Sequence, residues 1–209
     1  MVNNRLQKII DIIPQNSIGI IDVGTDYGYL PIQLALDGFK GEIYASDLRQ
    51  KPLNVAINNA QFYDVFHRIH FYIDNGLNQC NYNKIDTIII AGMGGDLICD
   101  ILDKAEWTMD QSYTMILQPM SKPEILRFWL CNNGYKIVNE YYVNDTGRDY
   151  TILLVVFTGE NEHYSDAELF IGKNPSKSRI QAVIKELRKK PYSAFDNAIL
   201  KELENYEST

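Results

Sequence analysis

The sequence contains few of the residues that mark secreted, metal-binding or membrane proteins. Its three cysteines, Cys80, Cys99 and Cys131, form no CxxC pair, so we expect neither a disulfide framework nor a zinc ribbon. The three histidines have no metal-ligand spacing, and we expect no bound metal. No signal-peptide core opens the chain, and no apolar run is long enough to span a bilayer. We therefore expect a soluble, cytoplasmic protein with no membrane contact.

Charge is unevenly distributed along the chain. The net charge of −7 argues against a general nucleic-acid binder. Residues 173–190, however, hold five Lys and two Arg against one Glu. Such a run either binds phosphates or forms a solvated helix face, and the sequence alone leaves both open.

Short β-rich runs alternate with amphipathic helical stretches over most of the 209 residues. This alternation predicts βαβ units and a doubly wound parallel sheet. The predicted strands are 17–22, 42–47, 69–74, 86–91 and 113–118, and the predicted helices lie near 27–37, 50–62, 94–104 and 122–133.

The late part of the body departs from this pattern. Two further strands, 135–144 and 149–158, are joined by only four residues, so they must pair in antiparallel fashion. A mostly parallel, seven-stranded α/β sheet closed by such a hairpin is the layout of Rossmann-like class I methyltransferases. A simple NAD-binding domain would continue with parallel strands.

The last 45 residues have a different pattern from the body. Two helices are predicted at 174–190 and 193–206, with a proline between them, which indicates an αα-hairpin. We therefore expect a Rossmann-like domain over residues 1–164 and a small helical extension over 165–209.

The clearest chemical signal is the corner that follows the first strand. It has the pattern Asp22-x-Gly24-x-Asp26-x-Gly28, in which glycines permit a tight turn and close approach of a ligand. The Asp26 carboxylate would repel a dinucleotide phosphate. The corner therefore favours S-adenosylmethionine (SAM), whose amino group and sulfonium are positive. The alternative is an ordinary strand–turn–helix corner.

The next two strands end in acids that suit the same ligand. Asp47 lies about 20 residues after the glycines, where an acid can hold both ribose hydroxyls. It could instead cap the following helix. Asp74 could accept a hydrogen bond from the adenine amine of SAM, or Asp74-Asn75-Gly76 could be a plain turn.

The fourth and fifth strands end in a glycine cluster and an amide. Three of the residues in Ala91-Gly-Met-Gly-Gly95 are glycine, which indicates either close approach to a ligand or a tight structural turn. Gln118 could present its amide to a purine edge or cap the next helix.

Together these motifs resemble the bacterial tRNA (adenine-22-N1)-methyltransferase family. The resemblance rests on Asp-Val-Gly-Thr-Asp-Tyr-Gly-Tyr-Leu-Pro (22–31), Ala-Gly-Met-Gly-Gly (91–95) and Leu-Gln-Pro (117–119). It implies a SAM-dependent enzyme that methylates N1 of adenine 22 in tRNA and carries a coiled-coil-like C-terminal part. Tyr27 replaces a histidine common in the family, Met120 replaces an asparagine, and the C-terminal helices are shorter.

In the expected reaction the methyl group passes from the sulfonium to N1 of neutral adenine. This nitrogen needs positioning rather than deprotonation. The product ring is cationic, so a nearby carboxylate would stabilise the transition state. Asp26 is the first candidate for that role, although it could instead bind the SAM amino group. Gln118 is the second catalytic candidate. Met93 would line the space between the SAM methyl group and the adenine.

The remaining expectations concern binding. The competing hypotheses are a SAM enzyme for a small molecule and a nucleotide-binding protein, or NAD oxidoreductase, without methyl transfer. We expect a monomer. The candidate cofactor-binding residues are Asp22, Gly24, Asp26, Gly28, Asp47, Leu48, Asp74, Asn75, Gly76, Ala91, Gly92, Met93 and Gly94. The candidate tRNA-binding residues are Tyr27, Tyr29, Pro119, Lys177, Arg179, Lys185, Arg188, Lys189 and Lys190.

Overall fold

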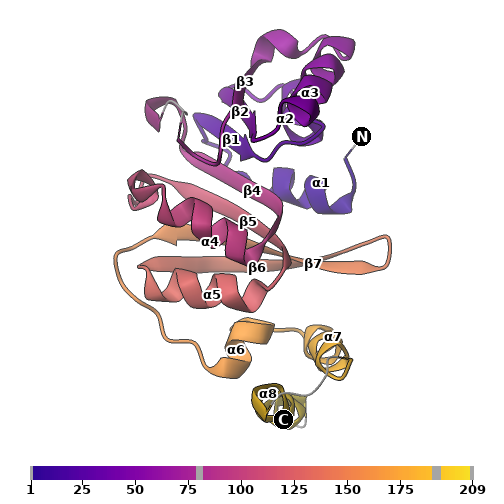
Figure 1. Ribbon diagram of the computed structural model, residues 1–209, viewed down its shortest axis with the longest axis vertical. Coiled ribbons are helices and arrows are strands. Elements are labelled where there is room, and N and C mark those ends of the chain that lie inside the picture. The colour runs from indigo at the N-terminus through magenta and orange to yellow at the C-terminus, as the bar shows by residue number, and fades with distance from the viewer. Residues whose placement is uncertain (1, 79–81, 190–193, 208–209) are drawn as a thin grey trace.

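The computed structural model describes residues 2–78, 82–189 and 194–207, and within them one seven-stranded sheet (Figure 1). The strand order is β3-β2-β1-β4-β5-β7-β6, in which β1 to β5 are parallel and β7 is antiparallel to both of its neighbours. This arrangement confirms the predicted fold class. The strands are β1 (Gly19–Val23), β2 (Glu42–Asp47), β3 (Ile69–Ile73), β4 (Thr87–Gly94), β5 (Thr114–Ser121), β6 (Tyr135–Asp145) and β7 (Arg148–Phe157).

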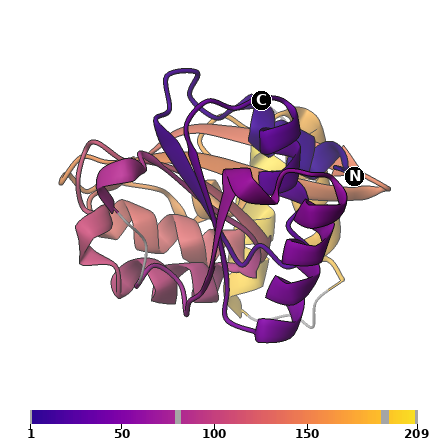
Figure 2. The ribbon, with the colours of Figure 1, turned by 90° about the horizontal axis from the view of Figure 1, so that it is seen from above.

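Helices cover both faces of the sheet (Figure 2). The helices α1, α2 and α3 pack on one face, whereas α4 and α5 pack on the other. The helices are α1 (Asn4–Asp11), α2 (Tyr29–Leu36), α3 (Gln50–Phe62), α4 (Gly95–Asp103), α5 (Pro123–Asn132), α6 (Asp166–Ile171), α7 (Lys177–Leu187) and α8 (Ala194–Glu207). Single 3₁₀ turns occur at Phe66–Arg68, Tyr82–Lys84 and Glu106–Thr108.

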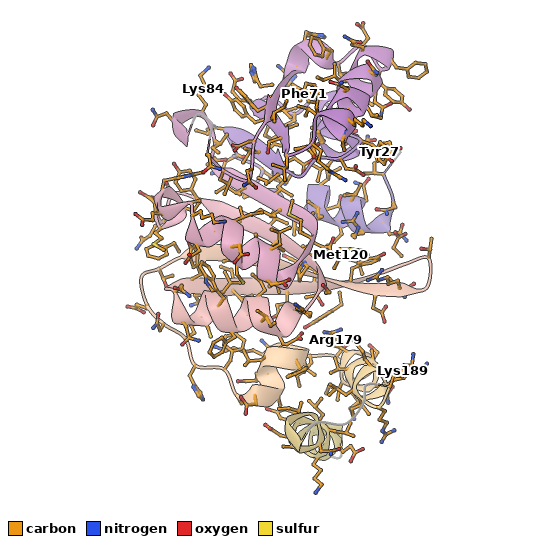
Figure 3. All side chains as sticks on the ribbon, in the orientation of Figure 1. Tyr27, Phe71, Lys84, Met120, Arg179 and Lys189 are labelled. Atoms are coloured by element: carbon orange, nitrogen blue, oxygen red, sulfur yellow. The ribbon has the colours of Figure 1, made fainter. Side chains whose placement is uncertain are left out.

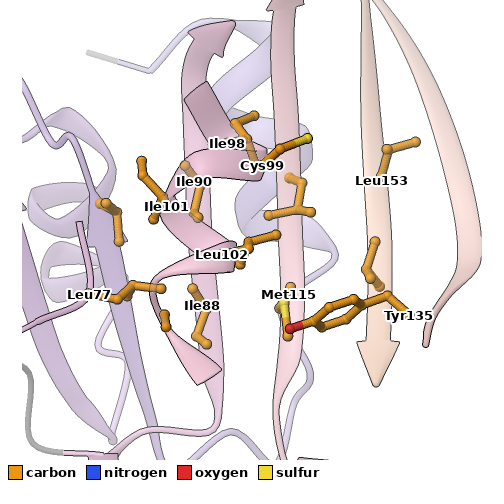
Figure 4. Packing of buried hydrophobic residues seen from close by; sticks show 14 of the residues in the cluster. Leu77, Ile88, Ile90, Ile98, Cys99, Ile101, Leu102, Met115, Tyr135 and Leu153 are labelled. Carbon is orange, nitrogen blue, oxygen red and sulfur yellow. The ribbon is translucent and has the colours of Figure 1, made fainter. Parts of the chain in front are cut away.

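The isoleucine-rich central strands supply both cores. Successive side chains of a strand point to opposite faces, so Ile89 packs toward α2 while Ile88 and Ile90 pack toward α4. Figure 4 shows Ile98 and Leu102 of α4 against this second side of the sheet. Each of these side chains is fully buried, which contributes about 1.5–3 kcal/mol per residue relative to exposure.

The hairpin between β6 and β7 closes through a two-residue turn. Thr146 and Gly147 both have positive φ, 50° and 81°, as a type I′ turn requires. That turn matches the twist of the two strands, and the predicted antiparallel pair is confirmed.

The sheet order reverses between β1 and β4. From this point β2 and β3 lie to one side, and β5, β7 and β6 lie to the other. Ligands of open α/β sheets bind outside the carboxyl ends of the strands at such a reversal. The corner after β1 and the glycine cluster of β4 therefore meet at the expected place.

The C-terminal extension has its own apolar core and one more helix than the sequence predicts. Buried side chains of α6, α7 and α8 form this core, which includes Ile171, Ile180 and Leu203. The six-residue α6 is too short to show a helical period, but a capping box of Ser165 and Glu168 fixes its start. The predicted αα-hairpin corresponds to α7 and α8.

Three other features differ from the prediction, one of which is strand β5, expected at 113–118 but extending to Ser121. Helix α1 was not expected; Asn3 begins it by accepting a hydrogen bond from the Leu6 N–H. Strand β4 was expected to end at Ala91 but continues to Gly94 through shifts in its register with β5. Tertiary pairing with β5 thus outweighs the low strand propensity of glycine. Among the described residues, no helix has both the length and the apolar character that a membrane span requires.

Candidate functional site

A cavity of about 650 Å³ lies at the carboxyl ends of β1, β2 and β4. Its size is that of a small-molecule site. It brings together eight of the predicted cofactor residues and two predicted substrate residues. From those two sets, the lining includes Asp22, Gly24, Asp26, Tyr27, Tyr29, Asp47, Leu48, Ala91, Gly92 and Met93.

Asp22 provides a buried carboxylate at the end of β1. Only 5% of the residue is exposed, and burial raises its pKa to about 6 against the opposing charge of Arg5. Desolvation disfavours the ionised form of such a group, and a cation beside it would restore that form. The end of β1 is therefore suited to a positively charged ligand group.

Asp47 lies at the end of β2 with its carboxylate held by two backbone N–H groups. One oxygen accepts from Arg49 N at 2.9 Å and the other from Asp26 N at 3.2 Å. Helix α3 begins at Gln50 with Arg49 as its N-cap, so Asp47 does not cap that helix. The alternative helix-cap role is thus wrong, and the carboxylate faces the cavity.

Asp26 and two tyrosines form the exposed mouth of the cavity. Asp26 has a left-handed backbone, φ 51°, which is uncommon for a residue other than glycine. Partial burial and the neighbouring Asp47 charge raise the pKa of Asp26. The rings of Tyr27 and Tyr29 lie 5.8 Å apart, and both are more than 40% exposed. The mouth therefore offers a carboxylate next to two aromatic surfaces.

The glycine cluster of β4 forms the wall opposite this corner. Gly92 has φ +87° and takes part in the irregular pairing with β5. Met93 reaches across to Gly24, where an added Cβ would collide with the methionine methyl group. The absence of a side chain at Gly24 therefore lets the two walls approach.

Five predicted cofactor residues lie outside this cavity. Gly28 packs against Ala56 of α3, where a Cβ would collide, so this glycine serves close packing, whereas Gly94 lies beside the exposed Asp96 side chain. Asp74 follows β3 next to Asp47 and accepts a hydrogen bond from Asn78 Nδ2 at 3.2 Å. The other two are Asn75 and Gly76, which continue the same turn.

Arg5 is a site residue that the sequence analysis missed. It comes from α1, lines the cavity, and donates a hydrogen bond from Nη1 to Gln118 Oε1. Gln118 is fully buried, and its Nε2 donates to Pro119 O at 2.9 Å. Gln118 therefore neither caps α5 nor lines the cavity; it lies behind Arg5. In the sequence, the one sign of this role is an arginine among the apolar residues near the N-terminus.

A second cavity of about 650 Å³ lies between the end of β5, the hairpin turn and α7. Met120 lines both cavities, so the second one begins where the first one ends. Figure 3 shows Tyr27, Met120, Arg179 and Lys189 along the same side of the molecule. The cations that line the second cavity are Lys122, Arg148, Arg179, Lys185 and Lys189, against Glu124, Asp149 and Glu186.

The predicted tRNA-binding residues divide between this cavity and its surroundings. Arg179 donates to the Phe170 carbonyl oxygen at 3.1 Å, so part of its function is to fix α7 against α6. Arg188 pairs with Glu204 of α8 at 2.6 Å, and Lys177 is exposed at the start of α7. Pro119 lines the second cavity, and Lys190 lies outside the described residues.

Comparisons with known proteins agree with this architecture. The profile of a family described as "Methyltransferase domain" matches residues 2–153. The tRNA (adenine(22)-N(1))-methyltransferase of Bacillus subtilis (strain 168) is 26% identical over 171 residues, which cover 82% of this chain and 71% of that protein.

Two solved structures extend the likeness through the C-terminal helices. A Streptococcus pneumoniae protein, provisionally assigned as a tRNA (m1A22) methyltransferase and bound to SAM, is 27% identical, with a TM-score of 0.88. The alignment covers 99% of this chain and 100% of that chain. M. capricolum TrmK, bound to S-adenosyl-homocysteine (SAH), is 27% identical with a TM-score of 0.74, over 100% and 95% of the two chains.

Proposed function

The chain belongs to the methyltransferase-domain family, and from that premise we propose that it transfers the methyl group of SAM to N1 of an adenine in tRNA. Adenine 22 is the proposed target because the B. subtilis relative is named for it. The observation that carries the proposal is the cavity that joins Asp22, Asp47 and the Asp26 mouth at the reversal of the sheet.

The residues of this cavity fit SAM by their chemistry. When bound, SAM supplies an electrophilic methyl group on its sulfonium. Asp22 would bind the positive amino group, because burial leaves its carboxylate without the solvation that bulk water provides. Asp47 would accept hydrogen bonds from the ribose hydroxyls, since backbone N–H groups already hold its carboxylate in place. Asp74, at the next strand end, would lie toward the adenine.

The mouth of the cavity fits a base that has left its stack. N1 of adenine lies on the Watson–Crick edge, so a paired or stacked target must be exposed before reaction. Tyr27 and Tyr29 would stack with the exposed base, and the Asp26 carboxylate would stabilise the positive charge that develops on the ring. Gln118 would act as a positioning residue through Arg5.

The second cavity would bind the tRNA backbone. Lys185 and Lys189 supply charge there, and their binding energy would depend steeply on salt. We propose that the domain of residues 1–164 performs the chemistry and that the extension of residues 165–209 holds the tRNA. We propose that the protein acts as a monomer in the cytoplasm, where its tRNA substrate is found.

The test is incubation of the full chain with unmodified tRNA and labelled SAM, followed by nucleoside mapping by mass spectrometry. The proposal predicts one N1-methyladenosine at position 22. A tRNA transcript in which this adenine is replaced by guanosine is the matched control and should remain unlabelled. Label at another position would correct the target. SAM binding without any labelling of tRNA would favour a small-molecule substrate and contradict the proposal.

A further inference from the structure

Arg148 lies at the point where the two cavities meet. Met120 lines both of them, and Arg148 Nη2 donates a hydrogen bond to the Met120 carbonyl oxygen at 3.1 Å. Arg148 itself lines the second cavity. A nucleotide whose base occupies the mouth of the first cavity, and whose backbone continues into the second, would therefore cross beside this arginine.

The hairpin that carries Arg148 is braced by helix α1. Figure 1 shows the end of the β6–β7 hairpin projecting beyond the other strands of the sheet. Lys8 of α1 lies 4.3 Å from the centre of the Tyr141 ring, and Asn4 Nδ2 donates to the Asn144 carbonyl oxygen at 3.4 Å. The projecting end is thus supported from the body, which makes it suited to hold a ligand in a fixed position.

The Arg148 side chain is ordered although the residue is exposed. Its guanidinium lies 5.4 Å from the centre of the Tyr150 ring in addition to its contact with Met120. A guanidinium has five N–H donors, and the bond to Met120 uses one of them. An arginine that is already ordered loses little entropy when it forms bidentate hydrogen bonds with a phosphate.

The acids near Arg148 leave its charge available. Asp145 is its register partner in the hairpin, and Asp149 follows it in the chain, where Oδ1 accepts from Asn144 Nδ2 at 2.7 Å. Among the described residues, no carboxylate oxygen lies within 4.0 Å of the Arg148 guanidinium. By contrast, Lys122 of the same cavity is paired with Asp96 at 2.8 Å.

We propose that Arg148 binds a phosphate that flanks the target adenosine of tRNA. A base that leaves its stack must be held through its backbone, and phosphate contacts fix position without reading sequence. Arg148 would therefore determine which nucleotide of the strand reaches the mouth formed by Asp26, Tyr27 and Tyr29. This inference rests on the proposed function, because it takes tRNA as the substrate.

The test uses tRNA in which one phosphate at a time is replaced by an uncharged methylphosphonate. The two linkages that flank the target adenosine are compared with one in a distant stem, and kcat/KM for methylation by the full chain is measured. For wild-type protein, one of the flanking replacements should lower kcat/KM roughly 10-fold, as loss of a charged hydrogen-bonded contact does. Arg148→Gln should show a similar loss on unmodified tRNA and no further loss on that modified tRNA.

Two controls accompany this comparison. Lys136→Gln is the matched variant, because Lys136 is an exposed cation at the opposite end of the same hairpin, and it should respond to each linkage as wild type does. Calorimetry should show wild-type affinity of Arg148→Gln for SAH, since Arg148 is not part of the lining of the first cavity.

The other outcomes would overturn the assignment. One is wild-type protein that is indifferent to both flanking replacements. Another is a further loss when Arg148→Gln acts on the modified tRNA, because independent losses mean that the arginine and that phosphate do not interact. If Arg148→Gln does not fold, Arg148→Lys decides. It keeps the charge without the planar fork and should lose less than wild type when that linkage is neutralised, and an undiminished loss would overturn the assignment. Absence of methylation of any tRNA by wild-type protein would contradict the proposed function and this inference with it.

Discussion

Replacing Arg127 with methionine should detach the C-terminal extension from the body. The Arg127 side chain is fully buried, and it donates to both carboxylate oxygens of Glu140 at 3.0 and 2.7 Å. Its Nη1 also donates to the Leu169 carbonyl oxygen at 2.7 Å, at the end of α6. The Tyr142 hydroxyl adds a contact of 2.7 Å with the Ile171 carbonyl oxygen. One arginine therefore joins α5, β6 and α6.

Arg127→Met would remove the cation from the Glu140 carboxylate, which also accepts from the Tyr142 hydroxyl, and would leave the Leu169 carbonyl oxygen without its donor. Removal of one partner from a buried ion pair costs about 3–5 kcal/mol, a large part of a typical free energy of unfolding. Urea denaturation measures this loss. Hydrogen exchange should rise most in α6 and α7, because their attachment depends on the lost contacts. Methylation of tRNA should fall with them.

A double variant separates loss of a charge pair from loss of packing. Arg127→Met combined with Glu140→Met removes both charges of the pair, so it should lose less stability than Arg127→Met alone. A loss below about 1 kcal/mol in the single variant would refute this account of the anchor. So would a double variant that is less stable than the single one.

Three further predictions concern the site. Asp26→Asn should fold normally and lose most turnover with little change in SAH affinity; normal turnover would remove Asp26 from the chemistry. The double variant Lys185→Gln with Lys189→Gln should weaken tRNA binding. The slope of the logarithm of the tRNA binding constant against the logarithm of salt concentration should fall by about 1 for each lost phosphate contact. Lys104→Gln, on the α4 side, is the control and should change neither. The raised pKa of Asp22, about 6, implies that SAH affinity falls below pH 6 as the carboxylate takes up a proton. The same shift affects the stability of ligand-free protein: the contribution of Asp22 is present below its unfolded pKa and is lost as pH rises through 6. Asp22→Asn should therefore stabilise ligand-free protein at pH 8 while weakening SAH binding.

Local signals in the sequence were sufficient for the main body of the fold. The near-continuous apolar run of β4 predicts a central strand covered on both faces, and Ile88 and Ile89 indeed pack on opposite sides. The Thr146-Gly147 turn forces the antiparallel hairpin because so short a connection allows no crossover. Both inferences depend only on residues that are close together in the sequence, so they can be made from one sequence.

Features that depend on distant contacts were not predictable. Arg5 lines the cavity because α1 packs against β6 and α2, and the Gln118 that it contacts lies 113 residues away in the sequence. Arg127 lies on an amphipathic helix and shows its function only when Glu140 and the α6 carbonyls surround it. Gly28 fits a ligand-binding motif by spacing, yet its packing against Ala56 becomes visible only in the folded chain.

The central claim is that the Asp22–Asp47 cavity is the SAM site. A crystal structure of the full chain grown with SAH tests it directly. We predict density for the ligand at the carboxyl ends of β1, β2 and β4, with the amino acid end beside Asp22 and the ribose beside Asp47. Ligand bound at another surface, with this cavity free of it, would contradict the account.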